Sequence, residues 1–96
     1  MITHVVMFKL EDHSDASIQR AIDKIRGLDG NVPSLRGLEV GRNLVPADRA
    51  YDLALIARFD DLAGLQAYQV HPQHVPVADY LRAVSERAAA VDFESD

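Results

Sequence analysis

A phenol and two imidazoles lie close together in one short stretch, residues 68–74, which reads Tyr-Gln-Val-His-Pro-Gln-His. Pro72 has no amide hydrogen and disfavours helical backbone at His71, so we expect one helix to stop there and another to begin at Pro72. His74 would then lie in the first turn of the second helix, where unpaired amides and the positive end of the helix dipole favour a neutral imidazole. Tyr68 lies three residues before His71, so both can project from one side of the first helix. Because a neutral imidazole can accept a proton, the stretch is a candidate for acid–base chemistry.

The overall composition restricts the class of protein. The 96 residues suit a single domain, which we place at residues 1–96. Lys and Arg total 10 against 15 Asp and Glu, a net charge of -5 that argues against a nucleic-acid partner. The absence of cysteine excludes disulfides, zinc–thiolate sites and thiol nucleophiles. The apolar start is broken by Lys9, Glu11 and Asp12, too soon for a signal peptide or a membrane span, so we expect a cytoplasmic protein with no membrane partner.

Hydrophobic periodicity and turn residues predict the elements that must position this stretch. Ser14 or Asp15 can cap the first helix, which Gly30 stops, and Asp60-Asp61 suit the start of the second. The expected strands are residues 2–10, 37–44, 51–59 and a short 91–94. The expected helices run from about residue 15 to 29, from about 61 to 70 and from about 72 to 89.

This order predicts an α+β, ferredoxin-like βαββαβ fold with a four-stranded antiparallel sheet, its second helix broken at Pro72. The first and third strands are central in that topology, and they are the two that are apolar on both faces. Because the helices can cover only one face, we expect the other face to pack on a second copy. The prediction is a homodimer that closes a dimeric α/β barrel through its sheets.

An apolar chamber between sheet and helices is the expected place for the chemistry. His4 shares a strand face with Val6 and Phe8, and His74 shares a helix face with the apolar residues Val77, Ala78 and Leu81. The two histidines and Tyr68 would therefore converge in an apolar cavity, the usual form of a small-molecule site. We expect it to take a small apolar or keto-containing ligand.

Each of these side chains also has a purely structural interpretation. His4 could be a hydrogen-bonded core histidine, His71 could cap its helix or bond to backbone, and Tyr68 could be a core aromatic. His74 is the least suited to packing alone, because an inward-facing imidazole at a helix start is a poor choice for that purpose. His13 is expected to be merely solvated.

A metal site is a further alternative, because His4, His71 and His74 could supply three imidazole ligands. The spacing is short, no carboxylate is evident nearby, and Pro72 separates the directions of the rings. We therefore expect neither a metal nor a cofactor.

Several segments of the chain together resemble the stress-responsive dimeric α/β-barrel (Dabb) family. They are His-Val-Val-Met-Phe-Lys from His4, Val-Gly-Arg-Asn from Val40, Tyr-Asp-Leu-Ala-Leu from Tyr51 leading to Phe59, the Tyr68 to His74 stretch, and Val-Asp-Phe from Val91. The resemblance implies a ferredoxin-like protomer that dimerises through its sheets. It also implies relatedness to plant polyketide cyclases, which perform an intramolecular aldol condensation without metal or cofactor.

The resemblance also suggests roles for particular residues. In those cyclases the residues that match His74 and Tyr68 form the catalytic pair, with His74 as the base, and the histidine that matches His4 lines the same cavity. The cyclases line their pocket with aromatic residues of the first helix, where this chain has Ile22 and Ile25. With His71, Val6 and Phe8, these residues are the expected substrate contacts.

Two functions remain open at this stage. The first is cofactor-free acid–base catalysis on a keto or polyketide-like compound, with His74 as base and Tyr68 as hydrogen-bond donor. The second is a non-catalytic stress-response or ligand-binding homodimer in which the same residues shape the core. Cofactor-free oxygenases share this dimeric architecture, but no feature of the sequence favours oxygen chemistry.

Overall fold

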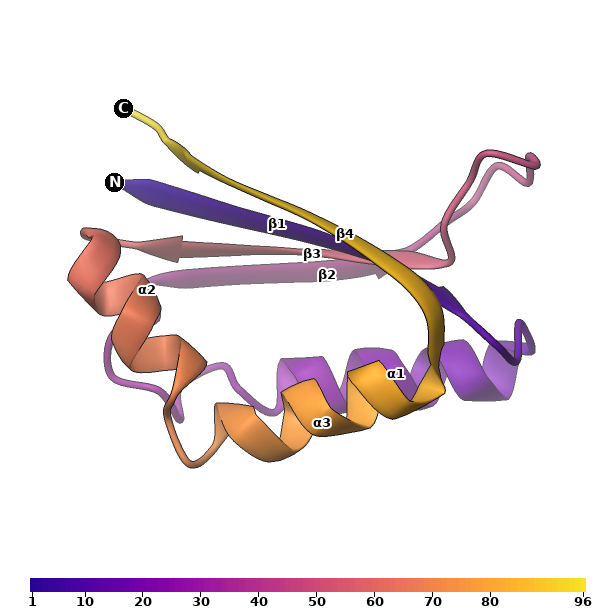
Figure 1. Cartoon of the computed structure of the whole chain (residues 1–96), viewed down its shortest axis with the longest axis horizontal. Helices are drawn as coiled ribbons and strands as arrows, with labels where there is room; N and C mark the ends of the chain where they lie inside the picture. The colour runs from indigo at the N-terminus through magenta and orange to yellow at the C-terminus, as the bar shows by residue number, and fades with distance from the viewer.

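A computed structural model describes residues 1–96. Four strands form one antiparallel sheet in the order β2-β3-β1-β4, and the helices lie on one side of it (Figure 1). In chain order the elements are β1 (Ile2–Leu10), α1 (Asp15–Arg26), β2 (Gly37–Arg42), β3 (Leu53–Phe59), α2 (Leu62–Gln69), α3 (His74–Val84) and β4 (Ser85–Glu94). The predicted ferredoxin-like fold is confirmed, with the first and third strands central. None of the helices is long and apolar enough to cross a membrane.

Helix α1 is fixed by its N-terminal cap and by an apolar face that packs on the sheet. Of the two predicted caps the structure uses Ser14, whose side-chain oxygen accepts a hydrogen bond from the Ser17 amide at 3.2 Å. The helix ends at Arg26, before the predicted stop, and the chain continues through turns in which Gly30 adopts a φ of +81°. The buried residues of this face are Ser17, Ile18, Ala21, Ile22 and Ile25.

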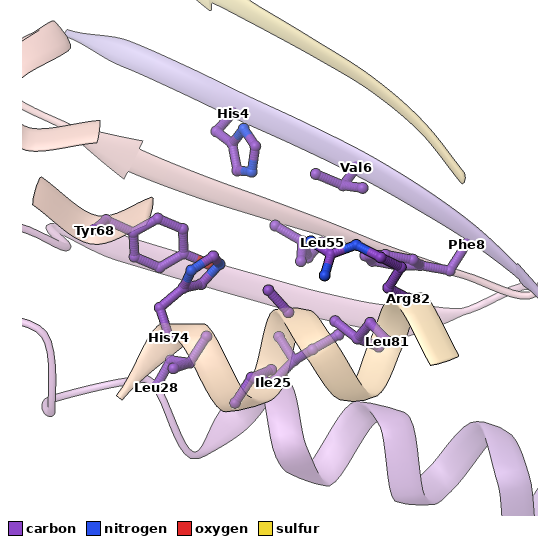
Figure 2. Close-up of a pocket in the computed structure, with 12 residues that line it drawn as sticks. His4, Val6, Phe8, Ile25, Leu28, Leu55, Tyr68, His74, Leu81 and Arg82 are labelled. Carbon is purple, nitrogen blue, oxygen red and sulfur yellow. The ribbon is translucent and has the colours of Figure 1, made fainter. Parts of the chain in front are cut away.

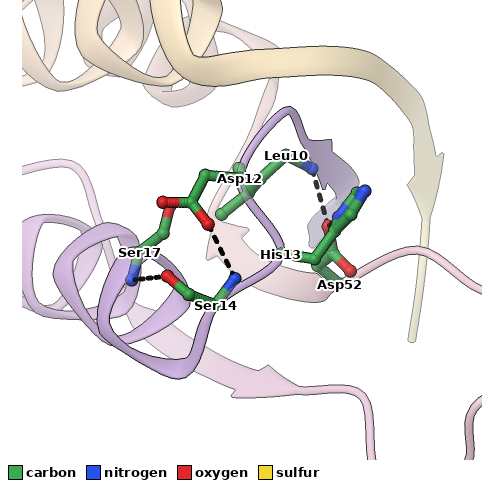
Figure 3. A network of polar contacts seen from close by, with 6 residues as sticks. All are labelled: Leu10, Asp12, His13, Ser14, Ser17 and Asp52. Carbon is green, nitrogen blue, oxygen red and sulfur yellow. Dashed lines mark hydrogen bonds and ion pairs between the residues drawn. The ribbon is translucent and has the colours of Figure 1, made fainter.

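A carboxylate ties the end of β1 to the start of β3 (Figure 3). One oxygen of Asp52 accepts hydrogen bonds from the Leu10 amide at 2.7 Å and from Nδ1 of His13 at 2.9 Å. The expectation that His13 is merely solvated is therefore wrong, although its ring stays half-exposed. Just beyond, the Ser14 amide bonds to Asp12 at 2.9 Å, and this bond holds the pKa of Asp12 below its ordinary value.

The helix pair α2–α3 is broken at Pro72, as predicted, but α3 begins two residues later than Pro72, at His74. Asp61 caps α2 by accepting a hydrogen bond from the Gly64 amide at 2.8 Å. In the turn, the His71 carbonyl accepts from the amides of His74 at 2.9 Å and Val75 at 3.0 Å. This turn places the first residue of α3 directly beside the last turn of α2.

Strand β4 corrects the prediction for the C-terminal part of the chain. The last helix stops at Val84 instead of near Ala89, and β4 runs from Ser85 to Glu94 instead of covering residues 91–94 alone. The Ala-, Glu- and Arg-rich sequence favours a helix locally. Pairing with β1, which includes Val6↔Ala90 and Phe8↔Ala88, outweighs that preference. The strands β2 and β3 are also shorter than predicted, and residues 43–52 form the connection between them.

The face of the sheet opposite the helices is apolar and uncovered. In the register, Val5 pairs with Ile56 on one side and with Val91 on the other, so these side chains share this face. Three apolar side chains of the face are exposed in the protomer, Met7 by 40%, Val91 by 55% and Phe93 by 46%. The prediction that the central strands are apolar on both sides therefore holds.

Candidate active site

A cavity of about 200 Å³ lies between the helix-covered face of the sheet and the three helices (Figure 2). Strand β1 supplies its roof, α2 and α3 supply one wall, and α1 supplies part of the floor. Six of the residues predicted for the site line it, namely His4, Val6, Phe8, Ile25, Tyr68 and His74. The apolar residues Val77, Ala78 and Leu81 of α3, expected to share the face of His74, line it as well.

Two predicted contacts do not line this cavity. Ile22 is buried in the hydrophobic core one turn before Ile25, on a part of α1 that packs away from the cavity. His71 uses Nδ1 to accept a hydrogen bond from the Gln73 amide at 3.1 Å, so its ring completes the turn at Pro72. The structure thus brings His74, and not His71, to the cavity.

His74 presents a free nitrogen to the cavity. Its Nδ1 lies 3.1 Å from the Gln69 carbonyl oxygen, which can only accept, so Nδ1 carries the proton and Nε2 carries the lone pair. Burial against the apolar lining lowers the pKa of His74. The bond to Gln69 opposes that shift, and the nearby rings of His4 and His71 add to it. The imidazole is therefore neutral at pH 7 and able to accept a proton at Nε2.

Tyr68 lies against His74 and is almost completely buried. Only 1% of the residue is exposed, and its ring centroid lies 4.2 Å from that of His74 and 4.9 Å from that of Phe59. Burial raises the pKa of Tyr68 to about 12, so its hydroxyl keeps its proton. That hydroxyl takes part in none of the hydrogen bonds within the chain, and Tyr68 lines the cavity. The ring that packs against His74 therefore carries an unpaired hydrogen-bond donor.

His4 completes the polar end of the cavity, with a partner that the sequence analysis missed. Its ring projects from β1 toward Tyr68 and His74, with centroids 6.1 Å apart for His4 and Tyr68 (Figure 2). Nδ1 of His4 donates to the carboxylate of Asp92, which lies directly opposite on β4. The expectation that no carboxylate lies nearby is wrong, and antiparallel pairing of the first and last strands was the signal for it. Asp92 fixes the orientation of the His4 ring and leaves Nε2 for the cavity.

Three further lining residues were not predicted. Leu55 of β3 pairs with Val6, Leu28 lies three residues beyond Ile25, and Arg82 follows Ala78 by one helical turn. Each continues a spacing that the predicted residues already defined, so extending those spacings would have found them. No group of three or more His, Cys, Asp or Glu side chains is placed to hold a metal ion.

The chain belongs to the stress-responsive A/B barrel domain (Dabb) family, whose family model matches residues 2–95. An uncharacterized protein of Streptomyces coelicolor is 34% identical to it over 77 residues, covering 77% of this chain and 79% of that protein.

Solved structures share the fold over nearly the whole chain. A dimeric ferredoxin-like protein of unknown function from Thermobifida fusca is 27% identical, with a TM-score of 0.87 over 98% of this chain and 90% of that one. The hydroxynitrile lyase of Passiflora edulis is 20% identical, with a TM-score of 0.85 over 99% of this chain and 93% of that one. At that identity the lyase shows the shared fold alone.

Proposed function

We propose that this protein is a homodimeric, cofactor-independent acid–base catalyst that removes a proton from a carbon next to a carbonyl group. The observation that carries the proposal is the pairing of an unprotonated His74 Nε2 with the unpartnered, protonated hydroxyl of Tyr68 in one apolar cavity. Proton transfer by a positioned side chain of this kind contributes about 10²–10⁴ in rate.

The proposed reaction begins when Nε2 of His74 takes the proton from the carbon. The electron pair of the broken C–H bond moves onto the carbonyl oxygen, and the enolate oxygen accepts a hydrogen bond from Tyr68. In an intramolecular aldol reaction the enolate carbon then bonds to a second carbonyl carbon of the same molecule. The alkoxide formed there takes the proton back from His74, so the base is regenerated. His4, oriented by Asp92, faces the same space and can position the second carbonyl.

A second copy completes the proposed assembly by covering the open face of the sheet. The apolar side chains of that face, Val5, Met7, Ile56, Val91 and Phe93, would be removed from water in a sheet-to-sheet dimer. The Thermobifida fusca protein, which is similar over 98% of this chain, is described as dimeric. Both observations support a homodimer that closes an α/β barrel.

A non-catalytic, ligand-binding or stress-response homodimer is the second candidate. The observation in its favour is the packing of the Tyr68 ring against both Phe59 and His74, which is a contact expected of a core aromatic in the absence of any reaction.

Deuterium exchange distinguishes the two candidates without knowledge of the natural substrate. A panel of small ketones and diketones is incubated with the protein in D₂O, and loss of the proton signals next to the carbonyl is followed by NMR. We expect the protein to accelerate exchange of at least one compound. His74→Gln should reduce the acceleration about 10²–10⁴-fold. Tyr68→Phe should reduce it less, because it removes only the hydrogen bond to the enolate.

The matched control is His13→Gln, which removes a histidine outside the cavity. Thermal unfolding of each variant checks that the fold persists. Equal exchange rates in the wild type and in a folded His74→Gln variant would assign His74 a structural role and favour the binding protein.

A further inference from the structure

One cationic side chain reaches the cavity at the end away from Tyr68 and His74. Arg82 lines the cavity together with Phe8 and Leu81, and its side chain extends from α3 on the Phe8 side (Figure 2). It is 76% exposed, so the cavity meets solvent at this residue. Arg82 therefore lies at the mouth of the cavity, and the polar pair lies at its inner end.

The Arg82 guanidinium has N–H donors that no group within the chain accepts. Its Nη1 donates to Asp79 at 2.9 Å, one turn earlier on α3, and no other hydrogen bond within the chain uses this side chain. A guanidinium offers five N–H donors in a planar fork that matches the two oxygens of a carboxylate. The free edge of Arg82 can therefore bind an anion while the bond to Asp79 is kept.

Small residues on β4 leave the approach to Arg82 open. Ala88 and Ala90 pair with Phe8 and Val6, so they share the helix-covered face of the sheet with these two lining residues. Both alanines are exposed, which shows that no helix covers this edge. A ligand can thus approach between α3 and β4 and pass Arg82 on its way to His74.

The distance between the two ends limits the length of such a ligand. Arg82 follows His74 by eight residues on α3, a rise of roughly 12 Å along the helix axis. Helical side chains point back toward the N-terminus, which shortens the span for the guanidinium. The cavity volume of about 200 Å³ lies below the usual range for drug-sized ligands, so the ligand is small.

We infer that the site takes a small, linear keto acid, whose carboxylate binds Arg82 at the mouth and whose carbonyl group reaches His74 and Tyr68. This inference rests on the proposed function for the inner end of the cavity and adds the class of substrate. The net charge of the chain is -5, so the protein as a whole repels anions, and affinity for a carboxylate requires a local cation such as Arg82.

The test uses binding and not turnover. Linear keto acids of increasing chain length are each paired with their methyl ester, which keeps the shape and removes the charge, and affinities are measured by isothermal titration calorimetry. We expect at least one acid to bind more tightly than its ester, by about fivefold to tenfold at low salt. The preference should decrease as salt is added, because the pair is solvent-accessible.

Arg82→Gln should abolish the preference for the acid, so that the acid and its ester bind with similar affinity. Arg26→Gln is the control, because it removes an equal charge from an exposed position outside the cavity lining. An acid preference that survives Arg82→Gln, or is absent from the wild type, would overturn the inference about the substrate. Because no step of this test requires proton transfer, such a result leaves the acid–base proposal standing, and that proposal fails only in the exchange experiment with His74→Gln.

Discussion

Burial shifts the pKa values of His74 and Tyr68 in opposite directions, and both shifts keep the side chain uncharged. Loss of solvent lowers the pKa of His74 and raises that of Tyr68 to about 12. A neutral imidazole can accept a proton from carbon, and a neutral hydroxyl can donate a hydrogen bond to the enolate oxygen. The cavity therefore sets the protonation states of both groups at pH 7 without a charged partner.

The raised pKa of Tyr68 predicts a loss of stability in alkali. The phenol ionises near pH 10 in the unfolded chain and near 12 in the folded one, so its stabilising contribution is complete below pH 10 and is lost as the pH rises through 12. We expect the wild type to lose about 2–3 kcal/mol of unfolding free energy across this interval, measured by urea denaturation. Tyr68→Phe should flatten that decline, whereas Tyr51→Phe, at a half-buried tyrosine outside the cavity, should leave it in place.

The sequence predicted His74, Tyr68 and His4 as site residues but not Asp92 or Arg82. The first three are recognisable because a histidine or tyrosine on an apolar face stands out. Asp92 becomes a partner of His4 only through the register of β1 with β4. Helical spacing from Ala78 could have placed Arg82 on the cavity lining, but its position at the mouth follows only from the shape of the folded cavity. The roles of Asp92 and Arg82 therefore depend on tertiary geometry, which local sequence patterns do not contain.

Among the helices and strands, the Asp52 network joins the last residue of β1, Leu10, to the turn before α1 through His13 and to the residue just before β3, Asp52 itself (Figure 3). Asp52→Ala leaves the Leu10 amide, which lies in a fully buried residue, without its acceptor. We expect a loss of about 1–3 kcal/mol in unfolding free energy, measured by urea denaturation. Asp29→Ala, an exposed aspartate in the turn after α1, is the control and should change stability by less than about 0.5 kcal/mol. A loss no greater than that of the control would show that the network contributes nothing to the fold.

Local signals predicted the elements well where they agreed with tertiary pairing. Strand β1 has the predicted bounds, Ile2–Leu10, and α1 starts at one of the two predicted caps. The prediction failed for Ser85 to Ala90, because alanine, glutamate and arginine favour a helix and only the pairing with β1 makes this segment a strand.

At the scale of the whole molecule, the uncovered sheet face predicts a dimer that one charge can disrupt. Val91 is 55% exposed in the protomer, so Val91→Glu should be tolerated by the monomer. In a sheet-to-sheet dimer the new carboxylate would be buried without a partner, which should weaken association by about a hundredfold or more. Sedimentation velocity at micromolar concentration should show a dimer for the wild type and a folded monomer for the variant.

The control for this experiment is Val70→Glu, which introduces the same charge at an exposed valine after α2. It lies on the helical side of the molecule, so the variant should remain dimeric. A wild type that sediments as a monomer, or a Val91→Glu variant as dimeric as the control, would contradict sheet-to-sheet assembly.

Titration of the ring nitrogens of His74 by ¹⁵N NMR, assigned with the His74→Gln variant, tests whether this residue can act as the base. We predict that Nδ1 carries the proton at pH 7, that Nε2 is unprotonated, and that the ring titrates below the ordinary histidine pKa of 6.5. Because the folded pKa is lowered, the group stabilises the fold above pH 6.5, and that stability is lost as the pH falls through the folded value. A His74 ring that is charged at pH 7, or that carries its proton on Nε2, would contradict its assignment as the base.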